Sequence, residues 1–63
     1  MIITMKKGTP NTEIQRMSEF IKSKGLDVHL SQGENYTILG CVGDTTALDP
    51  NTILAHQYVE DVK

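Results

Sequence analysis

An imidazole and a hydroxyl lie two positions apart in a stretch of strictly alternating residues. They belong to His29 and Ser31, within the run Leu26-Asp27-Val28-His29-Leu30-Ser31. Residues i and i+2 of a strand point to the same face of a sheet, so we expect these two side chains to lie together. Gly33 follows at a turn, where the missing side chain lets the backbone approach a ligand. These groups suit a polar small molecule such as an amino acid, although their spacing alone favours ordinary solvent-facing residues.

The same residues do not predict an active site. Asp27, His29 and Ser31 point one way, but a nucleophilic triad also needs a formed pocket and an oxyanion site, which a flat strand face lacks. Metal binding is not predicted either, because His29 and His56 are far apart and Cys41 stands alone without a CxxC or HxxxH pair. Cys41 is expected to be a small apolar core residue. We therefore predict no catalytic residue and no metal ligand in this chain.

Phosphate binding and phosphatase chemistry also lack their signatures. The glycines do not form the GxGxxG or GxxxxGK[ST] pattern that cradles phosphate between a strand and a helix. An acylphosphatase-like enzyme needs an arginine beside a backbone anion cradle. The one arginine, Arg16, is expected in the middle of a helix.

The first elements are a strand and an amphipathic helix. Residues 1–6 are mostly β-branched and apolar, which predicts a strand. Thr9 is expected to cap the helix, with Pro10 at its first position, where the missing N–H costs no bond. Gly25 is expected to end the helix in a left-handed conformation. The helix should bury one stripe, formed by Ile14, Met17, Phe20 and Ile21.

The middle of the chain predicts a hairpin. Residues 26–31 should form a half-buried strand with Leu26, Val28 and Leu30 facing inward. Residues 32–35 form the turn. Residues 36–42 have strand-forming side chains at the positions that face both sides of the sheet, which predicts a central strand. Gly40 in mid-strand indicates a bulge or a close packing contact.

The last third predicts a loop over 43–46, a short helix and a final strand. Asp49 before Pro50 repeats the helix-start pattern, so a helix is expected over about 50–57. Residues 58–63 alternate weakly and predict a fourth strand. The order βαββαβ predicts an α+β, ferredoxin-like sandwich, with two helices on one face of a four-stranded antiparallel sheet. The other face has no cover, so it is a candidate interface.

Size and charge narrow the function further. A chain of 63 residues is one small domain, expected over 1–63, with little room for a catalytic cleft beside its core. The net charge of −2, with acids and bases interspersed, does not favour nucleic-acid binding. The N-terminus lacks the order of a signal peptide, and no run is long enough to span a membrane. We therefore expect a cytoplasmic protein without membrane or nucleic-acid partners.

One run of residues resembles a known family. It is the run His29-x-Ser31-x-Gly33-x-x-x-Thr37-x-x-Gly40-x-x-Gly43-Asp44, and Met5-Lys6-Lys7-Gly8 and Val59-Glu60 add to it. On these residues, the chain resembles over its whole length the N-terminal, ACT-like regulatory domain of 3-deoxy-D-arabino-heptulosonate 7-phosphate (DAHP) synthases, also called phospho-2-dehydro-3-deoxyheptonate aldolases.

The resemblance implies a regulatory function. In such enzymes the domain precedes a (β/α)₈ barrel, a transferase that uses a divalent metal to condense phosphoenolpyruvate with erythrose 4-phosphate in the shikimate pathway. The domain binds tyrosine or phenylalanine between copies from different subunits, which gives feedback inhibition of aromatic amino acid biosynthesis. His29 and Ser31 match the family's ligand-contacting pair, and the Gln32-Gly33 turn would help to hold the effector. The chain itself is then expected to be a non-enzymatic fragment without a cofactor, lacking the barrel, and to associate with other copies and with that barrel.

Two features depart from the family pattern. Tyr36 stands where the family often has a basic residue, which bears on the effector or on the contact between domains. The chain also ends within its last expected strand, so we expect part of the first strand to lack a partner. A different function, an association module that holds subunits together and binds no small molecule, fits the same uncovered sheet face.

Overall fold

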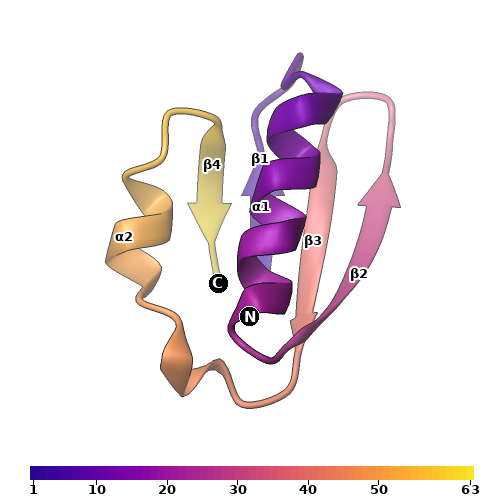
Figure 1. Cartoon of the computed structure of the whole chain (residues 1–63). Coiled ribbons are helices and arrows are strands. Elements are labelled where there is room, and N and C mark those ends of the chain that lie inside the picture. The colour runs from indigo at the N-terminus through magenta and orange to yellow at the C-terminus, as the bar shows by residue number, and fades with distance from the viewer.

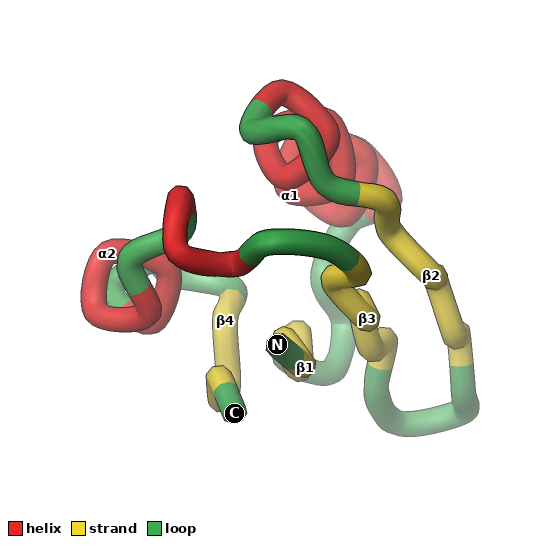
Figure 2. Tube along the Cα trace, turned by 90° about the horizontal axis from the view of Figure 1, so that it is seen from below, coloured by secondary structure: helices red, strands yellow, loops and turns green.

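The computed structural model describes all 63 residues as a four-stranded antiparallel sheet with two α-helices on one face (Figures 1 and 2). The sheet order is β2-β3-β1-β4, so β1 and β3 are central, which confirms the predicted fold and the central place of β3. The elements are β1 (Ile2–Met5), α1 (Asn11–Ser23), β2 (Asp27–Gln32), β3 (Thr37–Val42), the 3₁₀-helix η1 (Thr45–Ala47), α2 (Pro50–Leu54) and β4 (Val59–Val62). No helix is long and apolar enough to cross a membrane.

Helix α1 begins one residue later than expected. Pro10 is the N-cap, without a side-chain capping bond, and the Thr9 hydroxyl instead donates to the carbonyl oxygen of Lys6. The capping function predicted for Thr9 is therefore wrong, because the preceding turn takes its side chain. The helix ends as predicted: Gly25 has φ = 85°, and its N–H donates to the Lys22 carbonyl at 3.0 Å.

The core lies between the helices and one face of the sheet. The strands contribute alternate residues, as expected for a half-buried sheet. Two predictions are wrong. Leu30 is 46% exposed, because β2 is an edge strand with no neighbour on its outer side. Phe20, expected in the buried stripe of α1, is 41% exposed, because it lines an open groove between the two helices. The core cluster consists of Ile3, Met5, Met17, Ile21, Leu26, Leu39, Cys41, Leu48, Ile53 and Val59.

The connection from β3 to β4 differs from the prediction in two ways: it contains an additional 3₁₀-helix, η1, and its α-helix, α2, is shorter than expected. Asp44 caps η1, which replaces much of the loop expected at 43–46. Asp49 caps α2 as predicted, because its carboxylate accepts from the N–H of Asn51 at 3.0 Å. The helix ends at Leu54 rather than at residue 57, and a turn leads into β4.

The sheet is fully paired around β1. The N–H of Ile2 donates to the Lys63 carbonyl at 2.7 Å, and the N–H of Lys63 donates back to Ile2 at 2.9 Å. The unpaired edge expected on β1 is therefore absent. Gly40 shows no bulge, since β2 and β3 keep regular register through it; the irregularity lies between β1 and β4, at Thr4 and Met5.

Candidate functional site

The strand register places His29 and Ser31 on the uncovered face of the sheet. His29 lies opposite Gly40, and Ser31 lies opposite Ile38. Residues directly opposite one another in an antiparallel pair share a face. Leu39, next to both partners on β3, is fully buried on the helix side, so Gly40 and Ile38 face the other way. The structure thus brings together the two side chains that the alternation singled out, and both are exposed.

Gly40 leaves a gap in the side chains of this face. A β-carbon placed at residue 40 would lie 3.6 Å from both the β-carbon and the carbonyl oxygen of His29. On its other side Gly40 lies opposite Ile2 of β1. The backbone is therefore bare between His29 and Ile2, where a flat group can lie against it.

An apolar patch surrounds this gap. Ile2, Ile38 and Val42 share the face of Gly40, and they are 45%, 37% and 60% exposed. We call these three residues the open-face patch. Apolar side chains beside an imidazole and a hydroxyl can hold an amphipathic ligand, with its apolar part on the patch and its polar part on β2.

Gln32, the last residue of β2, and Gly33 in the turn after it were also expected to help hold an effector. Gln32 lies opposite Thr37, one position out of phase with Ser31, so it belongs to the helix-side set. The N–H of Gly33 donates to the Tyr36 carbonyl at 2.9 Å, so this turn uses the backbone group that was expected to be free for a ligand. The structure therefore places Gln32 on the other side of the sheet from His29 and Ser31, and the parts of Gln32 and Gly33 in effector binding stay predictions.

The far edge of the same face carries charges that sequence reasoning missed. Asp61 lies opposite Thr4, and Lys63 exchanges two backbone hydrogen bonds with Ile2. The Lys63 ammonium lies 3.9 Å from the Asp61 carboxylate. These residues share a face with His29 and Ser31 through two intervening strands. No local sequence signal marks this relation, because it depends on the pairing of both chain ends.

The single cysteine belongs to the core. Cys41 is buried, and this burial raises the pKa of its thiol above the ordinary value, which keeps it neutral. Its predicted place in the core is confirmed. No group of three or more His, Cys, Asp or Glu side chains lies close enough together to hold a metal ion.

Comparison with known proteins identifies one family and solved structures of the same fold. The family model described as the DAHP synthase ferredoxin-like domain matches residues 1–63. The crystal structure of the phospho-2-dehydro-3-deoxyheptonate aldolase (DAHP synthase) from Thermotoga maritima superimposes with a TM-score of 0.86 and 25% identity. The alignment covers 95% of this chain and only 18% of that chain. No curated protein matches by sequence.

Proposed function

Because the chain belongs to the DAHP synthase ferredoxin-like domain family, we propose that it is the regulatory domain of a DAHP synthase and binds tyrosine or phenylalanine. Binding of this effector provides feedback inhibition of the first step of aromatic amino acid biosynthesis, in the cytoplasm. The observation that carries the proposal is the uncovered sheet face, where His29 and Ser31 lie beside the open-face patch.

The chemistry of this face suits an aromatic amino acid. The ring lies on the bare backbone at Gly40, against Ile2, Ile38 and Val42, which removes apolar surface from water. The imidazole of His29 and the hydroxyl of Ser31 supply hydrogen bonds to the polar groups of the ligand. Ser31 is the group that tells a phenol from an unsubstituted ring.

A second copy of the domain completes the site. A single flat face cannot enclose a ligand, and specific small-molecule sites bury most of the ligand surface. Two open faces that meet over the effector enclose it from both sides. The effector then acts by binding the associated arrangement better than the separated one, which shifts the population toward it.

The catalytic chemistry belongs to the rest of the parent enzyme. This chain spans 18% of the Thermotoga maritima DAHP synthase chain that it matches. We place the condensation step and its divalent metal in the barrel of the parent, because no acidic or histidine cluster here fits a metal. This domain is then a non-enzymatic part that associates with the barrel.

The alternative is an association module that binds no small molecule. Exposed Ile2, Ile38 and Val42 on one face favour it, since such patches mark protein interfaces. An association module pairs equally with and without amino acids. A sensor pairs more tightly when its effector is present.

The experiment is an NMR titration of the labelled chain with tyrosine, phenylalanine and tryptophan, with leucine as the control. Sedimentation measurements on the same samples report the state of association. We expect saturable shifts at His29, Ser31 and Gly40 with one aromatic amino acid, and tighter pairing in its presence. Association without any ligand shift would instead establish the association module.

A further inference from the structure

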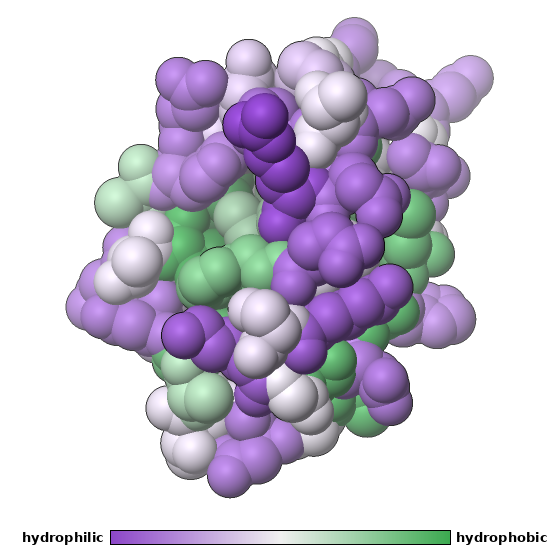
Figure 3. All heavy atoms as spheres, in the orientation of Figure 1, coloured by the Kyte–Doolittle hydropathy of each residue, from purple (hydrophilic) through white to green (hydrophobic).

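A groove of about 330 Å³ lies between α1 and α2, on the helix side of the sheet. It is therefore separate from the uncovered face that carries His29 and Ser31. Figure 3 shows a hydrophobic area between the positions of α2 and α1, with hydrophilic side chains around it. Ligand sites in proteins have volumes of about 300–1,000 Å³, so this groove has room for a ligand with one ring.

The floor of the groove is apolar. Met17 and Ile53 are buried, and the ring of Phe20 remains exposed along one side. An apolar group that lies on these side chains removes its own surface and that of Phe20 from water. The floor therefore favours a ligand with an apolar part but does not fix the orientation of that ligand.

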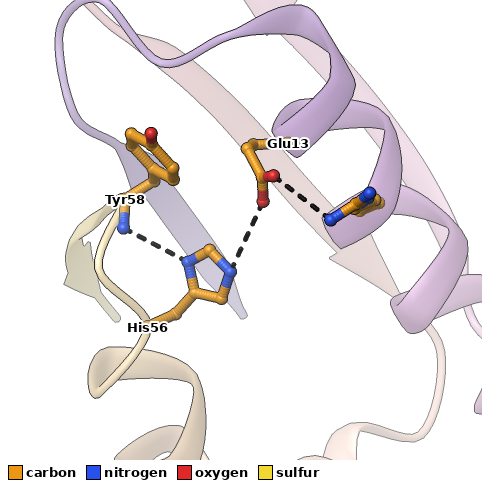
Figure 4. Close-up of polar contacts among 4 residues, drawn as sticks. Glu13, His56 and Tyr58 are labelled. Atoms are coloured by element: carbon orange, nitrogen blue, oxygen red, sulfur yellow. Dashed lines mark hydrogen bonds and ion pairs between the residues drawn. The ribbon is translucent and has the colours of Figure 1, made fainter.

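A polar wall from α1 and from the turn after α2 supplies the orientation. The Nδ1 atom of His56 accepts a hydrogen bond from the N–H of Tyr58 at 3.2 Å (Figure 4). The proton of the neutral ring is therefore on Nε2. This atom points toward Oε2 of Glu13, from α1, at a distance of 3.9 Å.

The gap between His56 and Glu13 has the size for one shared oxygen. A direct hydrogen bond requires about 2.7–3.2 Å between donor and acceptor. At 3.9 Å, the Nε2–H of His56 and the Glu13 carboxylate do not form one. An oxygen beside this gap lies within hydrogen-bond distance of both atoms. It must accept from Nε2–H and donate to Oε2, and a hydroxyl group does both.

The charges of the wall favour a neutral ligand. Arg16 lies 3.4 Å from Oε1 of Glu13 and balances its charge. An added carboxylate would meet the Glu13 carboxylate, which is only 21% exposed, and an added ammonium would have to share that carboxylate with Arg16. A neutral hydroxyl avoids both the repulsion and the competition.

We propose that the groove between α1 and α2 binds a small neutral molecule with an apolar, one-ring body and one hydroxyl, which bridges His56 and Glu13. The ring lies on Met17, Phe20 and Ile53. The hydroxyl accepts from Nε2 of His56 and donates to Oε2 of Glu13. This site is independent of the effector site proposed for the uncovered face.

The test is an NMR titration of the labelled 63-residue chain with p-cresol as the probe. Three comparison probes are titrated in the same way: toluene, which lacks the hydroxyl; benzylamine, which adds a positive charge; and phenylacetate, which adds a negative charge. We expect saturable p-cresol shifts at Phe20, Ile53 and His56 in the millimolar range, as for a probe with so few atoms. Toluene should bind about fivefold more weakly, because it makes neither hydrogen bond. Equal binding of p-cresol and toluene, tighter binding of either charged probe, or no shift at these residues overturns the proposal.

A matched pair of variants tests the bridge. Glu13→Gln weakens the acceptor, since hydrogen bonds to a charged oxygen are about twice as strong as neutral ones. We expect it to reduce p-cresol affinity several-fold and to leave toluene binding unchanged. Glu19→Gln makes the same change on the same helix outside the groove, where Glu19 accepts from Gln15 at 2.9 Å, and should change neither. An unchanged p-cresol affinity in Glu13→Gln would contradict the proposed hydroxyl bridge between His56 and Glu13. If that variant does not fold, the comparison of the four probes on the unaltered chain still tests the site.

Discussion

His29 and Ser31 have different partners across the sheet, which gives them different functions in the proposed effector site. His29 lies over the bare backbone of Gly40, whereas Ser31 stands beside Ile38. We therefore propose that the imidazole contacts the ring of any effector that lies on Gly40. The hydroxyl, two residues further along the strand, would contact only a ligand that extends in that direction, so we assign general affinity to His29 and discrimination to Ser31.

Ser31→Ala should change the preference between tyrosine and phenylalanine. The hydroxyl offers a partner to a phenol, and a typical hydrogen bond contributes about 0.5–1.5 kcal/mol, which corresponds to a several-fold change in relative affinity. Calorimetric titration of both amino acids measures the ratio. Ser18→Ala on α1, away from this face, is the control and should leave it unchanged. A constant ratio in Ser31→Ala would remove Ser31 from the site.

Two glycines should respond in opposite ways to the same change. Gly40 has an ordinary backbone conformation, and a β-carbon there meets His29 at a normal 3.6 Å. Gly40→Ala should stabilise the fold by about 0.4–1 kcal/mol, through a less flexible unfolded chain, and weaken effector binding by filling the gap.

Gly43→Ala, at the residue directly after β3, is the contrast. Its φ is 127°, and a β-carbon would lie 3.2 Å from Cδ2 of Leu26, so the variant should be less stable than the unaltered chain. Urea unfolding of both variants measures the difference. Equal stabilities would contradict this account of the two positions.

At the scale of elements, short helices depend on their caps. Helices η1 and α2 have three and five residues, too short to be stable without tertiary contacts. Each begins with an aspartate whose carboxylate accepts a backbone N–H two residues on, Asp44 from Thr46 and Asp49 from Asn51. These caps fix the path that carries Leu48 and Ile53 into the core.

The Asp44 cap should make stability depend on pH. The Thr46 hydroxyl, and then its backbone N–H, lower the pKa of Asp44 below its ordinary value of 3.8. A lowered pKa in the folded state means that this stabilisation is present above pH 3.8 and is lost as pH falls through the folded pKa. Asp44→Ala should therefore lower the Tm at pH 7 by more than at pH 3.

Thermal unfolding at several pH values measures this effect. Thr46→Val is the companion variant, because it removes the hydroxyl but keeps the backbone N–H. It should reproduce part of the pH-dependent loss of Asp44→Ala. A Tm difference between Asp44→Ala and the unaltered chain that is the same at pH 7 and pH 3 would show that the carboxylate charge does not stabilise η1.

At the scale of the whole molecule, the two faces differ in what they leave exposed. The helices cover one face of the sheet and leave the groove between them, while the other face exposes the open-face patch (Figure 2). Full burial of an exposed valine or isoleucine is worth about 1.5–3 kcal/mol. The patch residues are 37–60% exposed, so each contributes a part of that, and the pairing of two patches favours association. The proposed effector adds to that force rather than creating it.

A matched pair of lysine substitutions tests which face associates. Val42→Lys places a charge on the open-face patch, and Leu54→Lys makes the same type of change on α2, where the side chain is 48% exposed. Both residues are exposed, so both variants should fold. Only Val42→Lys should weaken self-association and abolish its enhancement by the effector in sedimentation experiments. An equal effect of both variants would mean that the helix side takes part in the contact.

Local patterns were sufficient to predict most of the fold. The alternation of residues 26–31 placed His29 and Ser31 on one face, Gly25 marked the end of α1, and Asp49 marked the start of α2. Each of these predictions depends on side-chain period or backbone conformation within a few residues. Thr9 shows the limit of such reasoning. Its hydroxyl donates to the carbonyl oxygen of Lys6 and does not accept from an N–H of the helix, and the local sequence favours neither bond.

The surroundings of the site depended on contacts between distant segments. Sequence reasoning did not place Ile2, Ile38, Asp61 and Lys63 on the same face as the predicted ligand pair, because that arrangement follows from the register of four strands. The groove could not be predicted from local sequence either, because Glu13 and His56 come close only when both helices pack on the same core. Register and helix packing are set by burial of the whole apolar set, Ile3, Leu39 and Ile53 included, and no local segment contains that information.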